Sequence, residues 1–414
     1  MGTDKKSVIK KTGNKEGENM KILLANKFYY HRGGAEVYAI NLETLLRNHG
    51  HEVAVFSMQH PQNLPSAYSG FFPKEIDFNH VRVNDFFTYI TRPLGSKEVK
   101  NKFSRLADEF KPDVIHLNNI HSQLSPVIAE IAHKKGIKII WTLHDYKILC
   151  PRYDCMRNGQ PCNLCYTNKL PVIRYSCMKN SRLTSILAYL EAIKWNREKL
   201  EKFTASFICP SEFLRNEMIN GSFNSQKLIT LNNFIDVAKI TRPVFRNKEN
   251  YYCYVGRLSP EKGVETLLKA ALELPHTLRI IGSGISENEL KQKYRAKQIV
   301  FEGYKSWNDI ETIVGNAMFS VMPSECLENN PLATLESLAL GTPVLGARIG
   351  GIPELIDENI NGMLFESGNK DDLKYKIHRF FEKSIPFDYE TIAQNARAKY
   401  SAENHVRSLI KIYG

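Results

Sequence analysis

Several kinds of segment are absent from this sequence of 414 residues. It has no run of about eighteen apolar residues, so it offers no candidate for a membrane-spanning helix. Residues 1–19 are charged and lack the apolar core that a secretory signal requires. No short-period repeat or low-complexity tract occurs in residues 20–414. We therefore expect a globular chain in the cytoplasm, with a disordered leader over residues 1–19.

The length exceeds that of most single hydrophobic cores, so two domains are expected. Short apolar runs alternate with amphipathic stretches over residues 20–234, and the alternation restarts over residues 235–394. The expected strands are residues 21–25, 53–57, 113–117, 138–143, 206–209 and 228–231, then 251–256, 277–282, 298–303, 318–323 and 342–346. This pattern is typical of parallel sheets covered on both faces. We predict an α/β protein of two Rossmann-like domains facing across a cleft, followed by a helical segment at residues 395–414.

The net charge of +12 lies in the first half of the chain. Residues 1–210 contain 31 lysines and arginines against 19 aspartates and glutamates, and the remainder is balanced. This asymmetry indicates an anionic partner such as a membrane surface, a polyanionic acceptor or nucleic acid, although a charge that only aids solubility explains it equally well. The basic, aromatic residues 83–105 are one expected membrane contact. The helix expected over 181–203 is interpreted as packing on the sheet through Leu183, Ile186, Leu187, Leu190 and Ile193.

Five of the eight cysteines lie within residues 150–177. In a cytoplasmic chain such a cluster favours a metal site over disulfides. One C-x2-C pair with further cysteines nearby suits tetrahedral thiolate coordination, so we predict a structural zinc ion. The predicted ligands are Cys155, Cys162, Cys165 and Cys177, with Cys150 as an alternative. An iron–sulfur cluster and plain reduced thiols are the other interpretations.

In the first domain, two strand-to-helix loops carry candidate binding residues, because ligands of parallel sheets bind beyond the carboxyl ends of the strands. Gly33 and Gly34 let a ligand approach the backbone at a helix N-terminus, which attracts phosphate. A tight turn that binds nothing is the alternative. His144 follows a later strand, where it can hydrogen-bond a hydroxyl or a phosphate, with Asp145 setting its tautomer.

Two cations share the first strand-to-helix loop of the second domain. Arg257 can grip a diphosphate as a fork and Lys262 as a point charge, and both would stabilise a departing diphosphate. Gly256 and Gly263 bracket these cations and open the backbone, which argues against a merely exposed basic turn.

Two glutamates eight residues apart follow a later strand of the second domain. Glu328 lies in the loop, and Glu336 lies about one and a half turns into the next helix. A carboxylate accepts hydrogen bonds from two hydroxyls at once, which is how vicinal diols of sugars and riboses are held. Chance often supplies this spacing. Its position between the cationic loop and the glycine-rich loop at 350–354 makes it specific.

Five motifs occur in a fixed order: R-G-G-A-E (32–36), T-L-H-D (142–145), V-G-R-L-S-P-E-K-G (255–263), E-x7-E (328–336) and G-G-I-P-E-L-I (350–356). The series resembles the retaining glycosyltransferases of family 4 over nearly all of residues 20–414. The resemblance implies the GT-B fold, in which the last helix, here residues 395–414, crosses back to the N-terminal domain.

The resemblance also implies roles for matching residues. The catalytic set is His144, Glu328, Arg257 and Lys262, and the donor-binding set is Gly33, Gly34, Tyr304, Asn330, Leu332 and Glu336. In these sets Glu336 would hold the ribose and Glu328 the donor sugar, whereas the Gly34 amide, Arg257 and Lys262 would bind the diphosphate. Asn330 and Leu332 would contribute amides, and Tyr304 would lie near the base. His116 and His121 are interpreted as structural or acceptor-side residues.

The implied reaction moves a hexose-type sugar from a nucleotide diphosphate sugar to a glycan or lipid-linked acceptor, in cell-surface polysaccharide or glycolipid synthesis at the inner face of the cell membrane. No cofactor is implied for catalysis. The sequence contains no Asp-x-Asp, which counts against the metal-dependent GT-A fold. The alternatives are a nucleotide-sugar epimerase of GT-B-like fold and a nucleic-acid-binding protein. Nucleic-acid binding would leave the motifs of the second domain unexplained, so no nucleic acid is expected as a partner.

Overall fold

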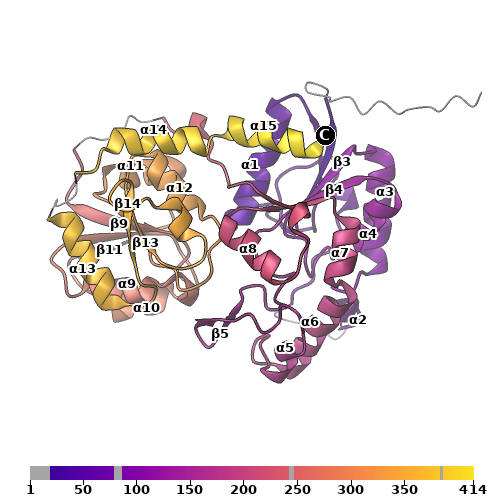
Figure 1. The fold of residues 1–414 in the computed structure, drawn as a ribbon, viewed down its shortest axis with the longest axis horizontal. Coiled ribbons are helices and arrows are strands. Elements are labelled where there is room, and N and C mark those ends of the chain that lie inside the picture. Colours follow the sequence, from indigo (N-terminus) through magenta and orange to yellow (C-terminus); the bar gives the residue numbers. More distant parts are fainter. Residues whose placement is uncertain (1–18, 79–85, 242–246, 383–385) are drawn as a thin grey trace, which may run out of the picture.

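The computed structural model describes residues 19–78, 86–241, 247–382 and 386–414. They form two α/β domains side by side, and the last helix of the chain returns to the first domain (Figure 1). The disordered leader predicted for residues 1–19 lies outside the described residues except for Asn19. None of the described helices is long and apolar enough to cross a membrane.

The first domain is built on a parallel six-stranded sheet in the order β2-β1-β3-β4-β7-β8. Its strands are β1 (Lys21–Ala25), β2 (Glu52–Phe56), β3 (Val114–Leu117), β4 (Lys138–Thr142), β7 (Ser206–Cys209) and β8 (Leu228–Thr230). Its helices are α1 (Gly34–Asn48), α2 (Phe86–Thr91), α3 (Lys97–Phe110), α4 (Val127–Lys134), α5 (Pro171–Arg174), α6 (Arg182–Lys194), α7 (Arg197–Phe203) and α8 (Glu212–Asn220).

Both faces of the first sheet are buried. Successive side chains of a strand point to opposite faces, so Leu23 and Ala25 pack with α3 and α4, whereas Ile22 and Leu24 pack with α1. Burial on both sides explains why these strands are continuous apolar runs in the sequence.

The second domain repeats this architecture with the order β11-β10-β9-β12-β13-β14. Its strands are β9 (Tyr251–Val255), β10 (Thr277–Ile281), β11 (Ile299–Gly303), β12 (Ser320–Met322), β13 (Val344–Ala347) and β14 (Gly362–Phe365). Its helices are α9 (Val264–Ala271), α10 (Glu287–Lys293), α11 (Trp307–Asn316), α12 (Leu332–Ala339), α13 (Lys370–Phe381) and α14 (Tyr389–Lys399). Every predicted strand is present. The edge strand β14 was not predicted, because its four residues follow a polar turn.

The chain passes between the domains at two adjacent points. Ile235 and Ser401 form a parallel bridge, so the outgoing and returning segments lie side by side. Before the return, α14 remains on the second domain, where Arg397 Nε donates to the Ala339 carbonyl at 2.8 Å. After it, α15 (Ala402–Tyr413) packs on the first sheet. The last helix therefore belongs to the core of the first domain.

An insertion between β4 and β7 corrects two predictions. It contains the short hairpin β5 (Met156–Arg157) and β6 (Gln160–Pro161), followed by α5, α6 and α7. The prediction of a single helix over residues 181–203 is wrong. Helix α6 ends at Lys194, with Trp195 as its C-cap, and a second helix, α7, starts after the Asn196 side chain, which caps it.

The predicted orientation of that helix is also wrong. Its aliphatic side chains Leu183, Ile186, Leu190 and Ile193 are exposed, and Leu187 is only partly buried. The side that packs inward carries Ser185, Ala188 and Glu191. The cause is the Glu191 carboxylate, which turns toward Lys147 of the first domain, 3.1 Å away.

Candidate functional site

Lys262 and Glu328 form the centre of the candidate site. Lys262 ends the short helix η5 (Pro260–Lys262) after β9, and Glu328 lies in the loop between β12 and α12. The Lys262 Nζ lies 2.5 Å from Glu328 Oε1, which also accepts a hydrogen bond from Ser324 Oγ at 2.8 Å. The structure thus brings together two of the predicted residues that are 66 positions apart in sequence.

Glycines make this approach possible. Gly263 has φ +65°, and a Cβ there would lie 1.8 Å from the Pro323 carbonyl oxygen. Gly351 packs equally closely, since its Cβ would lie 1.9 Å from the Asn329 carbonyl oxygen, and its amide donates to the Glu328 carbonyl at 2.6 Å. The cationic loop and the glycine-rich loop therefore hold the Glu328 loop from two sides.

The charge of Glu328 is fixed by its neighbours. Burial alone would raise the pKa of Glu328, but the Lys262 ammonium and the two hydrogen bonds hold it below its usual value. Burial alone would lower the pKa of Lys262, but the Glu328 carboxylate raises it above its usual value. Arg257 is well exposed, with its guanidinium 3.8 Å from Glu261. It is therefore free to move toward an anionic ligand.

Glu336 has different surroundings. It lies on α12 about one turn beyond the N-terminus, and burial raises the pKa of its carboxyl to about 7, against a smaller opposing effect of Lys239. The Lys239 ammonium also donates to Asn41 of α1 at 3.0 Å. Sequence reasoning missed Lys239, because it lies in the connection between the domains and belongs to no motif.

The N-terminus of α12 lies between the two glutamates. The first amides of a helix have no acceptor within the helix, and here Pro331 is the cap and Leu332 the first helical residue. The Oδ1 of the neighbouring Asn330 accepts from the Asn233 amide at 2.9 Å. Leu332 can therefore offer its amide to an anion, whereas the Asn330 side chain joins the two domains.

Several buried polar atoms near these residues have no hydrogen-bond partner within the described ranges. They are Asn118 Nδ2, Tyr146 Oη, Asn329 Oδ1, Asn330 Nδ2 and Thr334 Oγ1. Unpartnered buried polar atoms are rare in folded proteins. These atoms come from both domains and are available to a polar ligand between them, whereas other unpartnered atoms, such as Tyr252 Oη and His276 Nε2, lie elsewhere.

Gly33 and Gly34 lie at the N-terminus of α1. Gly33 is the N-cap, in extended conformation, and Gly34 is the first helical residue. No atom lies within 4 Å of a Cβ built on Gly34, so the backbone is uncrowded at this position. The N-terminus of this fifteen-residue helix has no side-chain cap and can hold a phosphate group, although the Glu36 carboxylate lies beside it, 3.2 Å from a Cβ built on Gly33.

His144 follows β4, as predicted, but its partner is not the one expected. Its Nε2 lies 2.9 Å from Asn118 Oδ1, whereas Asp145 Oδ1 accepts from the Lys147 amide. The prediction that Asp145 sets the tautomer is therefore wrong, since this short turn directs its carboxylate to the backbone. Burial lowers the pKa of His144 to about 3, so the ring is neutral and can hydrogen-bond a hydroxyl.

His116 and His121 are buried on or next to β3. His116 bonds Thr142 Oγ1 at 2.7 Å and the Tyr413 hydroxyl of α15 at 2.6 Å. It therefore ties the last helix to the sheet, and its role is structural. His121 stacks on Trp141, with ring centroids 5.4 Å apart.

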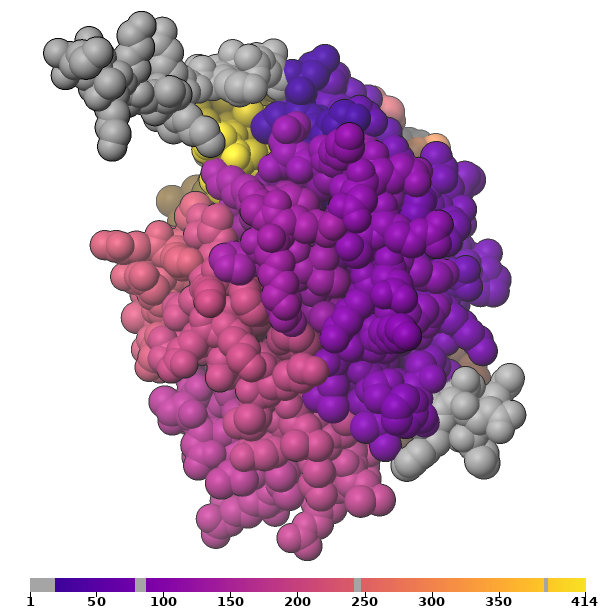
Figure 2. All heavy atoms as spheres, turned by 90° about the vertical axis from the view of Figure 1, so that its right-hand side faces the viewer, coloured from indigo at the N-terminus to yellow at the C-terminus, as the bar shows by residue number. Residues whose placement is uncertain are grey.

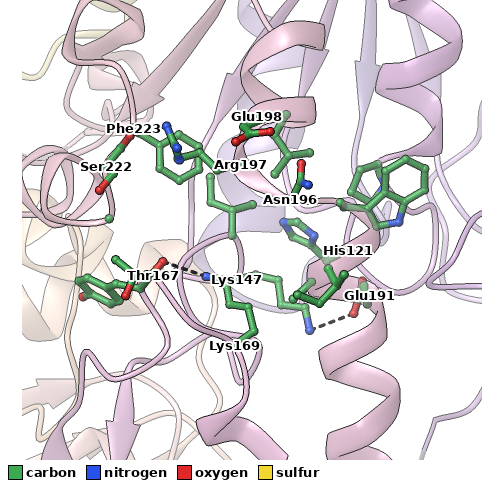
Figure 3. Close-up of a pocket in the computed structure, with 18 residues that line it drawn as sticks. His121, Lys147, Thr167, Lys169, Glu191, Asn196, Arg197, Glu198, Ser222 and Phe223 are labelled. Atoms are coloured by element: carbon green, nitrogen blue, oxygen red, sulfur yellow. Dashed lines mark hydrogen bonds and ion pairs between the residues drawn. The ribbon is translucent and has the colours of Figure 1, made fainter.

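A cavity of about 260 Å³ lies in the first domain, lined by side chains of the loops after β3 and β4 and of α6 and α7 (Figure 3). His121, Lys147 and Glu191 project into the same region, and a dashed line in Figure 3 marks the ion pair of the last two. Sequence reasoning missed this cavity, because it depends on how the insertion folds back.

The domains also meet through residues outside the predicted set. The Glu354 carboxylate, on the short helix η6 (Ile352–Leu355), accepts from the amides of Glu212 at 2.8 Å and Phe213 at 2.5 Å. These amides begin α8 of the first domain. Leu327, beside Glu328, packs against the apolar cluster of the first domain. The candidate site is therefore held at a domain junction.

The cysteines of the insertion lie close together, and the Cys150 thiol contacts those of Cys155 and Cys165. Cys155 and Cys150 belong to the apolar core of the first domain, and a small cavity of about 10 Å³ is lined by Cys150, Cys162, Cys165 and Cys177 but not by Cys155. Within the described ranges no three His, Cys, Asp or Glu side chains are placed to hold a metal ion. The predicted zinc set of Cys155, Cys162, Cys165 and Cys177, with Cys150 as the alternative, therefore stays a prediction.

Tyr304 is 81% exposed directly after β11, and no contact with the other predicted residues places it in the site. Its position near a base stays a prediction.

Two family models match the chain. The model described as Glycosyltransferase Family 4 matches residues 32–239, about half of the chain. The model described as Glycosyl transferases group 1 matches residues 238–399. Together they cover both domains and meet at the connection between them.

Individual proteins resemble the chain at low identity. An uncharacterised glycosyltransferase of Methanocaldococcus jannaschii is 25% identical over 214 residues, which cover 50% of this chain and 58% of that relative. An uncharacterised 42.6 kDa protein in the cps region of Klebsiella pneumoniae is 24% identical over 353 residues, 81% of this chain and 87% of the relative. The structure of Anabaena HepE in complex with UDP-glucose matches with a TM-score of 0.66 and 18% identity, covering 95% of this chain and 99% of HepE. This structural likeness shows a shared fold.

Proposed function

This chain belongs to glycosyltransferase family 4 and has the GT-B fold, and we propose that it transfers a hexose-type sugar from a nucleotide diphosphate sugar to a glycan or lipid-linked acceptor. The observation that carries the proposal is the Lys262–Glu328 ion pair, with Glu336 on the helix that follows. One carboxylate is held ionised and the other has a raised pKa, at two ends of the same short segment. Such a pair suits two different diols of one ligand.

We assign the diphosphate to the amides and cations at the domain junction. The uncapped N-terminus of α1 at Gly34 and that of α12 at Leu332 both attract anions. Lys262 has three donors and can bind a phosphate oxygen while it keeps Glu328 as a partner. Arg257 is exposed and can close on the phosphates. The HepE structure, which holds UDP-glucose, supports a uridine nucleotide as the first donor to test.

We propose that transfer occurs with retention. The acceptor oxygen would bond to the anomeric carbon on the face from which the diphosphate leaves, and the acceptor proton would pass to a diphosphate oxygen. Arg257 and Lys262 would stabilise the charge on the departing nucleoside diphosphate. The neutral His144 would orient the sugar through a hydroxyl, since its lowered pKa leaves no proton to give as an acid at neutral pH.

The acceptor is assigned to the first domain, which carries the excess positive charge. The Klebsiella relative is described as lying in a cps region, which supports a role in the synthesis of a surface polysaccharide. A glycan or a lipid-linked sugar with an anionic phosphate would suit this domain.

A screen of UDP, GDP and ADP sugars tests the proposal, with donor hydrolysis and thermal stabilisation as readouts. We expect one nucleotide sugar to be hydrolysed slowly and to raise the melting temperature by several degrees at saturation. No response to any nucleotide sugar would refute the transferase function. Interconversion of donor sugars without transfer would instead identify an epimerase.

A further inference from the structure

Helix α6 carries its large apolar side chains on the side that faces away from the protein. The exposed side chains are Leu183 (80%), Ile186 (36%), Leu190 (45%) and Ile193 (47%). Their spacing of three, four and three residues places them along one face of the helix, which we call the α6 face. Single exposed leucines are common, but an aligned stripe of four marks an interaction surface.

The α6 face is exposed although the helix is firmly attached. Glu191, on its inner side, pairs with Lys147 and accepts from the Ser122 amide at 3.3 Å. Both side chains of the ion pair are more than nine-tenths buried. The Met178 amide, in the segment before the helix, also donates to Ser185 Oγ at 3.0 Å. The helix therefore cannot turn its apolar side inward without breaking a buried ion pair, which is costly.

Further exposed apolar side chains lie beside the α6 face. Leu170 and Tyr175, on either side of α5, are 53% and 43% exposed, and Phe87 on α2 is 77% exposed. The three helices gather at the lower end of the first domain in Figure 1, and the segment that contains α6 forms the lower part of the surface in Figure 2.

The residues 83–105, predicted to contact a membrane, contribute little beyond Phe87. Val99 and Phe103 on α3 are buried in the core, and residues 83–85 lie outside the described part.

Cations predominate around the α6 face among the described residues, although Glu130 acts on Lys194 and Glu201 pairs with Arg197. Residues 166–197 contain six lysines and arginines and one acidic residue, Glu191, whose carboxylate is buried against Lys147. Arg182 and Lys194 stand exposed at the two ends of α6, and Arg174 is exposed on α5. The single acidic group of this fully described segment is thus turned inward, whereas Glu198, directly after it, is exposed. An apolar stripe edged by cations complements an anionic lipid surface.

We propose that the α6 face docks on a bilayer that contains anionic lipids, with α6 lying in the plane of the interface. The apolar side chains would enter the boundary between headgroups and acyl chains, and the flanking cations would contact lipid phosphates. A second copy of this chain fits the α6 face less well, because its own cations would lie against the cations that flank this face. The proposal does not depend on the proposed transfer reaction, since docking uses no residue of the candidate site.

Vesicle flotation tests the proposal with the full chain. The vesicles contain either phosphatidylcholine alone or phosphatidylcholine with about 30 mol% phosphatidylglycerol. We expect the protein to float with the anionic vesicles, less so as salt increases, and the double variant L183D/L190D to bind at least about tenfold more weakly. The matched control is I285D/I360D, since Ile285 and Ile360 are 88% and 62% exposed on the second domain. It should bind as the unmodified chain does.

A charge variant and a solution assay separate the outcomes. R182A/K194A should weaken binding and flatten its salt dependence. Equal flotation of L183D/L190D and the unmodified chain would overturn the proposal. So would a change from dimer to monomer in L183D/L190D in the absence of lipid, which would assign the face to a second copy. Donor hydrolysis without vesicles should be unchanged in every variant that melts normally, so a failure of docking is distinguishable from a failure of the proposed transfer.

Discussion

Glu328 and Glu336 belong to one motif but have opposite electrostatic surroundings. Lys262 contacts Glu328 directly and keeps the pKa of its carboxyl low despite burial. Burial dominates at Glu336 and raises its pKa to about 7. The first carboxylate is therefore ionised over the physiological range, whereas the second changes its charge within that range. Substitution and pH should distinguish their roles.

Glu328→Gln should lower the rate of sugar transfer by about 100- to 1,000-fold, because the amide cannot replace an ionised acceptor beside the reacting sugar. Lys262 would also lose its partner. The side chains of the pair are 19% and 15% exposed, so the free energy of unfolding should fall by roughly 1–3 kcal/mol, less than for a fully buried pair. Initial rates and denaturant unfolding measure the two effects.

The double variant K262M/E328Q separates catalysis from stability. Removal of both charges leaves no unpaired ion, so much of the lost stability should return while the rate stays low. Recovery of the rate in the double variant would contradict the assigned role of Glu328.

Donor affinity should depend on pH through Glu336. Only the ionised carboxylate accepts hydrogen bonds from both ribose hydroxyls, and with a pKa of about 7 the ionised fraction grows by about tenfold between pH 6 and pH 8. The affinity for a nucleotide diphosphate sugar, measured by calorimetry, should rise over this interval. Glu336→Gln should bind weakly and without this pH dependence. A pH-independent affinity in the unmodified chain would exclude Glu336 as the ribose ligand.

The stability of the ligand-free protein should change in the opposite direction. The pKa of Glu336 is raised in the folded state above its ordinary value of 4.5. The contribution of this carboxyl to the free energy of unfolding is therefore fully present below about pH 4.5, and it is lost as the pH rises through about 7. Glu336→Gln, which stays neutral, should become more stable relative to the unmodified chain over that interval. Melting temperatures of both proteins across the pH series test this sign.

At the level of secondary-structure elements, the site depends on loops that pack backbone against backbone. Gly263→Ala places a methyl group against the Pro323 carbonyl and requires φ +65°. We expect a loss of roughly 2–4 kcal/mol of unfolding free energy and of donor binding, since strain and clash add. The control is Gly136→Ala, where φ is +72° but no atom lies within 4 Å. The Gly136→Ala change should lower the free energy of unfolding by only about 1 kcal/mol. Similar melting temperatures for both variants would show that contact with the Glu328 loop is unimportant.

Motifs and buried strands were predictable from sequence because each has a local signature. Strands such as β1 and β9 are short apolar runs, and Lys262 and Glu328 lie in loops that any strand-helix alternation places at one edge of the sheet. The orientation of α6 was not predictable, because its apolar period is the same whether the stripe faces inward or outward. The decisive contact is the ion pair of Glu191 with Lys147, which joins two segments 44 positions apart. The partner of His144 was missed for the same reason, since Asn118 comes from another strand.

At the scale of the whole molecule, the two domains are connected by contacts that belong to the candidate site itself. Asn330 bonds Asn233 in the connection between the domains, and Leu327 packs on the first domain. Helix α15 adds a permanent link through His116 and Tyr413. Because the Glu328 loop takes part in the domain contact, a change in domain spacing should alter the donor site directly.

Glu354 offers the clearest test of this coupling. Its carboxylate, from the second domain, accepts from two amides at the N-terminus of α8 in the first, where the helix dipole favours a negative charge. Glu354→Ala removes this contact without touching Lys262 or Glu328. We expect a larger radius of gyration by small-angle X-ray scattering and about three- to tenfold weaker donor binding, whereas Glu289→Ala, an exposed position on α10, should change neither. Weaker binding at an unchanged radius would mean that Glu354 acts locally on the Gly351 loop, and the domains would then be held by α15 and Asn233 alone.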